Sequence, residues 1–168
     1  MFVTHHFSVD EVNNLISESF VRIFGNVVEH FPAAAIGILK CRPFEDINHI
    51  VQAIYDFLDC LKPHEKEKIF QLYPDLLECG VCNSPFIMEK EHQNGYGRID
   101  LEEKRRVQEL NVRYKDKFGF PFITTKTDMS NLYTEILSRV DNSKEEELQR
   151  AMREVKAMVY NRVHEIVH

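Results

Sequence analysis

Residues 118–122 read Phe118-Gly119-Phe120-Pro121-Phe122, and this string comes directly after a strongly helical segment. Pro121 cannot continue a helix, and it disfavours helical geometry at Phe120. Gly119 supplies the backbone angle that commonly closes a helix. The string therefore predicts a helix end followed by a rigid extended strip of rings and backbone amides. Such a strip suits one wall of a site for a small planar ligand, and it also suits a core plug that ends one helix.

Helical periodicity extends to both sides of this strip. Before it, Asp100-x-x-Glu103 predicts the cap of a long helix. After it, residues 131–140 predict a shorter helix, and Ser143-x-x-Glu146 predicts the cap of a final helix with an inward apolar stripe. The charge-rich stretches 102–106 and 144–150 are interpreted as solvated helix faces.

The N-terminal half is also helical by pattern. Ser8-x-x-Glu11 predicts a first short helix, residues 17–24 a second, and Pro32 the first turn of a third. A broad apolar stripe predicts a central helix, and Pro63 begins another. Residues 86–93 predict one more short helix. The stripe consists of Ile47, Ile50, Val51, Ile54, Phe57, Leu58 and Leu61. The chain is thus predicted to be all-α, a single compact domain over residues 1–168 with about eight or nine helices.

Composition limits the classes of function. The chain has 168 residues, of which 43% are hydrophobic and 29% charged, so it can bury a substantial core. A formal net charge of -6 without a basic run argues against nucleic-acid binding. No apolar stretch approaches the ~20 residues of a membrane span. The N-terminus lacks a secretory signal and the C-terminus lacks a Ser-Lys-Leu type signal, so we expect a cytoplasmic protein.

The cysteines and histidines predict no metal site. Cys79-Gly80-Val81-Cys82 has the spacing of a redox motif or half a zinc site, but no second pair completes it. The histidines show no metal-ligand spacing. We therefore expect reduced structural thiols and no metal.

Several segments in a fixed order resemble the ureidoimidazoline decarboxylases of urate breakdown, the OHCU decarboxylase family. They are residues 25–32 (GNVVEHFP), Arg42-Pro43-Phe44, Pro74-Asp75-Leu76, and residues 111–123, in which Asn111-x-x-Tyr114 leads into the aromatic strip. Arg139-Val140-x-Asn142 before a Glu-rich helix start also resembles the family's closing pattern. The resemblance covers about residues 20–165, and its segment 111–123 is highly specific.

The resemblance implies a compact helical fold, a homodimer, and no metal or organic cofactor. It implies a carbon-carbon lyase that converts the small molecule 2-oxo-4-hydroxy-4-carboxy-5-ureidoimidazoline to (S)-allantoin. Such chemistry requires a pocket that holds a polar heterocycle and aligns the departing carboxylate with the adjacent π system. A positioned acid must then protonate one face of the resulting carbanion-like centre.

The family's acid/base histidine is replaced in this chain. The family motif His-Pro-Asp-Leu-Ala-Gly corresponds to Tyr73-Pro74-Asp75-Leu76-Leu77-Glu78. A histidine titrates near neutrality, whereas an unperturbed tyrosine titrates near ~10. Tyr73 can donate a proton or a hydrogen bond as a neutral phenol, but it is a poor base at neutral pH. Loss of positioned acid/base catalysis typically costs ~10²–10⁴ in rate.

A second departure lies at residues 88–93. When the chain is aligned on Asn94-Gly95-Tyr96-Gly97, Gln93 keeps the family's Gln, Glu89 falls on its Ser and His92 on its Glu. We hypothesise that Tyr73 and His92 face one pocket as a rewired acid/base pair. The alternative is that His92 is an ordinary polar residue on an exposed helix face.

The binding wall is better preserved. By resemblance, Pro74 flanks the acid position, and the residues that follow the strip line the substrate together with Glu89 and Gln93. Lys126 is a candidate counter-charge for a substrate oxygen or a solvated lysine, and Glu29 and Arg42 are interpreted as ion-pair or helix-packing residues. The predicted wall residues after the strip are Phe122, Ile123, Thr124, Thr125 and Lys126.

Two rival functions remain open. An inactive family member would bind a purine-derived or other planar ligand without turning it over, and the replacements at Tyr73, Glu89 and His92 favour this alternative. A helical protein-interaction module would use the aromatic strip as core and would not be stabilised by a small molecule.

Overall fold

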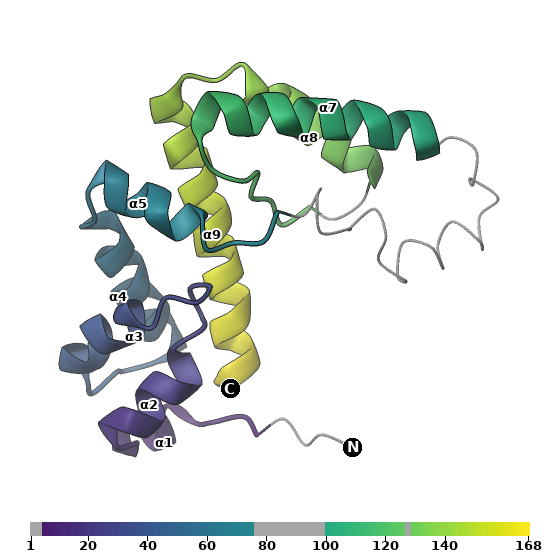
Figure 1. The fold of residues 1–168 in the computed structure, drawn as a ribbon. Helices are drawn as coiled ribbons and strands as arrows, with labels where there is room; N and C mark the ends of the chain where they lie inside the picture. Colours follow the sequence, from purple (N-terminus) through teal and green to yellow (C-terminus); the bar gives the residue numbers. More distant parts are fainter. Residues whose placement is uncertain (1–4, 76–99, 127–128) are drawn as a thin grey trace. The chain divides into compact units, whose positions relative to one another are not determined.

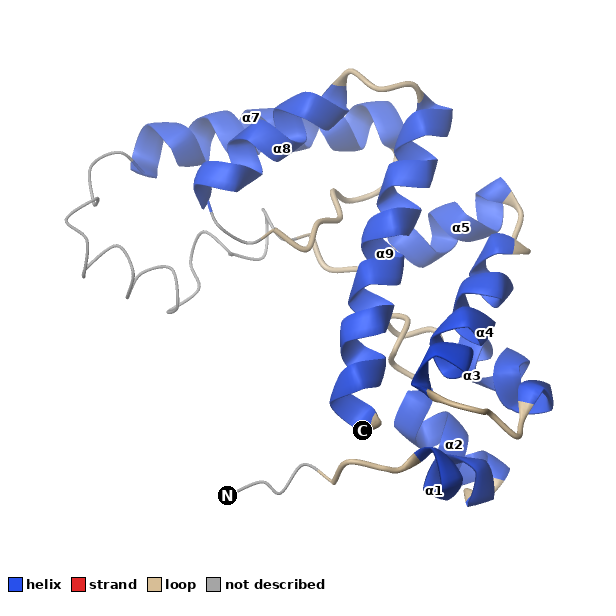
Figure 2. Cartoon of the chain, turned by 180° about the vertical axis from the view of Figure 1, so that it is seen from behind, coloured by secondary structure: helices blue, strands red, loops and turns tan. Residues whose placement is uncertain are grey.

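A computed structural model describes residues 5–75, 100–126 and 129–168 of the chain (Figure 1). These residues form α-helices and one 3-10 helix and contain no β-strand, as the colouring of Figure 2 shows. A single parallel bridge pairs Phe7 with Val167. The all-α prediction is therefore confirmed. Within the described ranges, no helix is long and apolar enough to cross a membrane.

The chain divides into two compact units. The first contains residues 1–72 and 152–168, and the second contains residues 73–151. Helix α9 (Lys144–Ile166) contributes residues 144–151 to the second unit and its remainder to the first. The single-domain organisation stays a prediction.

The first unit contains the N-terminal helices. Hydrogen bonds from backbone to side chain fix two of their starts: Ser8 Oγ accepts from Glu11 N (3.1 Å), and Asp46 Oδ1 accepts from His49 N (2.7 Å). The predicted helix 17–24 and the predicted central helix are both present, although the central helix ends at Asp59, before the last residue of the predicted stripe, Leu61. The elements are α1 (Val9–Asn14), α2 (Ser17–Phe24), α3 (Ala33–Ile38), the 3-10 helix η1 (Leu39–Cys41), α4 (Ile47–Asp59) and α5 (Pro63–Phe70).

The two polar residues predicted to serve the packing of this unit do so. Arg42 donates to the carbonyl of Leu15 (2.6 Å) just after α1, and Glu29 pairs with Arg162 of α9 (2.5 Å). The core of the unit includes the predicted α4 stripe, of which Ile50, Val51, Ile54 and Leu58 are buried.

The second unit contains α7 (Asp100–Phe118), the strip that follows it, and α8 (Met129–Val140). Both views show α7 and α8 side by side. Helix α8 begins two residues before the predicted start at 131. The predicted helix 86–93 lies outside the described residues.

The prediction that residues 144–150 form a solvated face is wrong at one position. Glu147 is fully buried, because α9 presents it to Arg139 of α8 and Tyr114 of α7. The capping box of the same helix is confirmed, since Ser143 Oγ accepts from Glu146 N (3.2 Å) and Glu146 Oε2 accepts from Ser143 N (2.8 Å).

Candidate functional site

The first part of the candidate site is the segment Tyr73-Pro74-Asp75, which follows the turn after α5. Pro74 disfavours helical backbone at Tyr73, so the chain leaves the turn in an irregular conformation. The side chain of Tyr73 is buried, with 5% of its surface exposed, whereas Pro74 is exposed. The phenol at the predicted acid position therefore faces the protein.

Asp75 connects this segment to α7. Its Oδ1 lies 3.1 Å from Asn111 Nδ2, and its Oδ2 lies 2.8 Å from Lys115 Nζ. Asn111 and Lys115 are four residues apart and therefore lie on one face of the helix. The carboxylate thus has a neutral and a charged donor from the same helix face.

The second part of the candidate site is the aromatic strip. Gly119 has φ 80°, and its N–H donates to the carbonyl of Lys115 (2.8 Å), so the helix closes where the sequence predicts. The rings of Phe118, Phe120 and Phe122 are buried, and each contacts the ring of Tyr114, with centroid distances of 4.6, 6.0 and 5.2 Å. The rings of the strip thus form core packing on α7.

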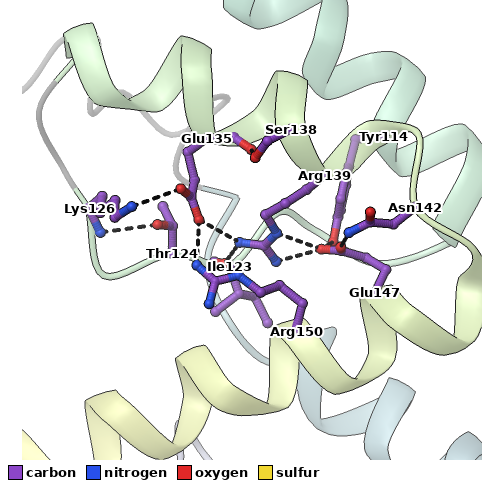
Figure 3. Close-up of polar contacts among 10 residues, drawn as sticks. All are labelled: Tyr114, Ile123, Thr124, Lys126, Glu135, Ser138, Arg139, Asn142, Glu147 and Arg150. Atoms are coloured by element: carbon purple, nitrogen blue, oxygen red, sulfur yellow. Dashed lines mark hydrogen bonds and ion pairs between the residues drawn. The ribbon is translucent and has the colours of Figure 1, made fainter.

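A buried ion pair supports the end of the strip (Figure 3). Arg139 donates to Glu147 Oε1 through Nε (2.8 Å) and Nη2 (2.5 Å), and through Nη1 to the carbonyl of Ile123 (2.7 Å). Its guanidinium also lies 4.4 Å from the ring centroid of Phe122. Arg139 therefore holds the end of the strip through the Ile123 carbonyl and the Phe122 ring.

Tyr114 completes this cluster. Its hydroxyl donates to Glu147 Oε1 (2.5 Å), and Asn142 Nδ2 donates to Glu147 Oε2 (3.1 Å). Burial and the neighbouring carboxylate of Glu147 raise the pKa of the Tyr114 phenol. This phenol therefore stays protonated and acts as a hydrogen-bond donor.

Glu135 binds Lys126, which lies in the polar segment that follows the strip. Its Oε2 accepts from Lys126 Nζ (3.0 Å), and its Oε1 accepts from Arg150 (2.7 Å), as Figure 3 shows. Burial acts to raise the pKa of Glu135, but the hydrogen bonds from Arg150 and Lys126 outweigh it, and the pKa is lowered. The side chain of Lys126 remains 53% exposed, so its ammonium is accessible beside this pair.

The predicted site residues thus take different places. Phe122, Ile123 and Thr124 are buried, whereas Thr125 and Lys126 are exposed. Thr124 Oγ1 accepts from the backbone N–H of Lys126 (3.0 Å), which fixes the turn between them. Both parts of the candidate site are attached to α7. The predicted residues Glu89, His92 and Gln93 lie outside the described residues.

Sequence reasoning missed Glu135 and Glu147. For Glu147 a signal existed, because it lies four and eight residues before Ala151 and Val155 and so continues the buried stripe of α9. For Glu135 a weaker signal existed, because Arg139 lies four residues later on the same helix, at 3.8 Å. Its closer partners Lys126 and Arg150 come from other segments.

Chemically, the second unit offers a buried phenol, an accessible ammonium and a strip fixed by hydrogen bonds. These groups can bind a polar heterocycle and supply a proton. The fold and the site together define an all-α protein with a candidate ligand site mounted on one long helix.

The chain belongs to the OHCU decarboxylase family, whose model matches residues 13–164. The 2-oxo-4-hydroxy-4-carboxy-5-ureidoimidazoline decarboxylase of Xenopus laevis is 30% identical over 92% of this chain and 91% of its own length. The protein of the same description from Amia calva is 31% identical over 94% and 93%. The family resemblance seen in the sequence is therefore confirmed.

A solved structure supports the fold. The chain aligns with a crystal structure of (S)-allantoin synthase with a TM-score of 0.77, at 20% identity and over 95% of its residues. The alignment covers 54% of that solved chain, so this chain spans about half its length.

Proposed function

We propose that the chain decarboxylates 2-oxo-4-hydroxy-4-carboxy-5-ureidoimidazoline and forms (S)-allantoin. The observation that carries the proposal is family membership over residues 13–164, which include both parts of the candidate site. The curated relatives from Xenopus laevis and Amia calva bear the name of this decarboxylase.

In the proposed reaction, the bond between the ring carbon and its carboxylate breaks, and carbon dioxide leaves. The electron pair stays on the ring carbon, delocalised into the adjacent π system. Tyr73, in its neutral form, delivers a proton to one face of the adjacent ureido-bearing carbon of this π system, and the hydroxyl on the decarboxylated carbon loses its proton to become the ring carbonyl. Tyr73 is reprotonated from solvent or through His92. Delivery from one face fixes the stereochemistry of the product.

The binding residues are proposed as the family resemblance assigns them. Phe122, Ile123 and Thr124 present backbone groups to the heterocycle, and Lys126 provides the counter-charge for a substrate oxygen. The accessible ammonium of Lys126 supports this role, and Glu135 would keep Arg150 as a partner if Lys126 turned to a ligand. Pro74, Thr125, Glu89 and Gln93 complete the proposed set.

The remaining parts of the proposal concern the whole protein. We propose a cytoplasmic homodimer, built of a single domain, that needs no cofactor. Sedimentation of the purified protein and turnover after exhaustive dialysis against a chelator test the dimer and the cofactor independence.

The replacement of histidine by Tyr73 favours a second candidate, a family member that binds a planar ligand and does not turn it over. In that case allantoin or a related compound raises the melting temperature without product formation. A helical interaction module, the third possibility, predicts no change in melting temperature with any small molecule.

The test is turnover of freshly generated substrate, produced in situ by urate oxidase and hydroxyisourate hydrolase and followed by circular dichroism of the allantoin. We expect the natural protein to form one enantiomer faster than the spontaneous reaction. Tyr73→His should increase the rate by up to ~10²–10⁴, because an imidazole restores a group that titrates near neutrality. Tyr73→Phe should abolish the acceleration.

The natural protein, Tyr73→His and Tyr73→Phe together distinguish an active decarboxylase from a family member that only binds a ligand. If only Tyr73→His is active, the pocket is intact and the natural protein is a binding protein. If neither the natural protein nor Tyr73→His accelerates the reaction, the decarboxylase proposal is wrong. A further variant, His92→Ala, tests the rewired pair, because unaltered turnover would remove His92 from the mechanism.

A further inference from the structure

We propose that Asn111 and Lys115 are positioning residues that fix Tyr73 through the carboxylate of Asp75. The inference rests on the proposed function, because it concerns how the proposed acid is oriented. Its physical basis is the contact of Asp75 with two donors on one face of α7, at 3.1 Å from Asn111 Nδ2 and 2.8 Å from Lys115 Nζ.

The connection between Asp75 and Tyr73 is short and stiff. Only Pro74 separates them, and its ring fixes one of the two soft backbone dihedrals of that residue. A carboxylate anchored at two points on a helix therefore restricts where the Tyr73 phenol can lie. The side chain of Asp75 is 12% exposed, so water competes weakly for its oxygens.

Asn111 has a feature that apolar packing does not explain. The residue is 2% exposed, and its Oδ1 accepts no hydrogen bond within the described part of the chain. A buried acceptor without a partner lowers stability, and an apolar residue of similar shape would avoid that loss. The hydrogen bond from Asn111 Nδ2 to Asp75 therefore explains why an asparagine is found here, since the side-chain oxygen of Asn111 cannot donate to a carboxylate.

Two roles for Asn111 make different predictions. If it served packing, Asn111→Leu would lower the free energy of unfolding and leave Tyr73 in place. If it positions Tyr73, Asn111→Leu should make Tyr73 more mobile whatever the net change in the free energy of unfolding, because loss of the hydrogen bond to Asp75 and removal of the unpaired Oδ1 act in opposite directions. The matched control is Arg113→Gln, which removes an exposed ion pair of the same helix with Asp141.

The first test does not depend on catalysis. The chain contains no tryptophan, so Tyr73→Trp introduces a single indole fluorophore at the position of interest. In this background we expect Asn111→Leu and Asp75→Asn to shift the emission to longer wavelength and to increase quenching by acrylamide. Arg113→Gln should change neither. Emission and quenching that stay the same in Asn111→Leu and Asp75→Asn would overturn the proposal.

A second measurement covers the case in which an indole does not fit at position 73. In the natural Tyr73 background, hydrogen exchange of the backbone amides of Tyr73 and Asp75 should accelerate in Asn111→Leu and Lys115→Met, and not in Arg113→Gln. Exchange that accelerates equally across the whole unit would indicate general destabilisation and would overturn the positioning role.

The kinetic test follows if the natural protein or Tyr73→His turns substrate over. Displacement of a catalytic group by about 1 Å can cost on the order of 10²-fold in rate. We therefore expect Asn111→Leu to lower kcat by roughly tenfold to a hundredfold with little change in KM. A rise in KM at constant kcat would contradict positioning of the acid. If no variant is active, the proposed function fails. The fluorescence and exchange measurements still decide whether Asn111 and Lys115 fix Tyr73 through Asp75.

Discussion

Glu147 carries a carboxylate with no exposed surface, and the polar groups of three residues satisfy it. Arg139 supplies two hydrogen bonds, Tyr114 one and Asn142 one. A buried charge that keeps its hydrogen-bond partners is tolerated, whereas a buried charge that loses them lowers the free energy of unfolding strongly. The cluster therefore makes the position of the strip depend on a small number of residues.

The first prediction at this scale concerns Glu147→Leu. We expect the free energy of unfolding to fall by ~3–5 kcal/mol, because Arg139 would remain buried without its nearest counter-charge and would keep only Glu135, whose Oε1 lies 3.8 Å from Arg139 Nη1. Urea unfolding followed by far-ultraviolet circular dichroism measures the loss. The double variant Glu147→Leu/Arg139→Met should recover part of it.

The control is Glu145→Leu, a matched substitution on the exposed side of the same helix, which should change the free energy of unfolding by less than about 0.5 kcal/mol. Equal losses in Glu145→Leu and Glu147→Leu would show that the buried pair does not contribute as described.

At the residue scale, the sequence predicted local features and missed pairings. It predicted Gly119 as a helix end, because the reason is local to the backbone. It placed Glu147 on a solvated face, because an acidic residue in a charged stretch is exposed in most helices. Its burial depends on Arg139 and Tyr114, and only the tertiary fold brings these residues together.

The residue that directly follows helix α7 has a left-handed backbone. Gly119 has φ 80°, and a Cβ added there would meet no atom within 4 Å. The cost of a side chain at this position is therefore conformational and not steric.

We predict that Gly119→Ala lowers the free energy of unfolding by ~1–2 kcal/mol, the usual cost of left-handed backbone for an L-residue. Gly119→Asn should cost less, because asparagine tolerates this conformation. Thermal unfolding of the three proteins checks the order Gly, Asn, Ala. Equal loss in both variants would indicate a steric cause instead.

At the element scale, the helices could be predicted because their signals are local. The capping box at Ser143 and Glu146, the proline at Pro63 and the α4 stripe all mark helices that the structure contains. The start of α8 was placed two residues late, because Asp128, a residue type favoured at helix starts that directly precedes Met129 in the sequence, was not used as a signal. Helix ends are the least certain part of any such prediction.

For the whole molecule, the ion pairs of Glu135 with Lys126 and Arg150 make the free energy of unfolding depend on pH. The pKa of Glu135 is lowered from 4.5, so near that pH the unfolded chain binds more protons than the folded protein does. The stabilisation is therefore complete above about pH 4.5, and it is lost as the pH falls through the lowered pKa.

We predict that the free energy of unfolding of the natural protein and of Glu135→Gln differs most above about pH 5. The difference should shrink as the pH falls through and below 4.5. Denaturant unfolding at a series of pH values measures this. Glu102→Gln, which removes an exposed partner of Arg106, is the control and should show no such convergence. A difference that stays constant with pH would contradict the role of Glu135.

The all-α class of the fold could be predicted from the sequence, whereas the contacts between distant segments could not. Periodicity and the family resemblance both indicated an all-α chain, and both were right. Neither indicated that Asp75 would bind Asn111 and Lys115, since these residues come from segments that are distant in sequence. The assignment of the site residues rests on the resemblance and stays a prediction.

The hydrogen bond from Tyr114 to Glu147 has an optical consequence. Burial delays formation of the phenolate at Tyr114, and it also raises the pKa of Tyr55. The chain has six tyrosines and no tryptophan, so phenolate absorbance can be measured without interference from indole. In an alkaline titration, Tyr114 and Tyr55 ionise at higher pH than an ordinary tyrosine. The difference spectrum between the natural protein and Tyr73→Phe then isolates the ionisation of Tyr73, the phenol proposed as the acid.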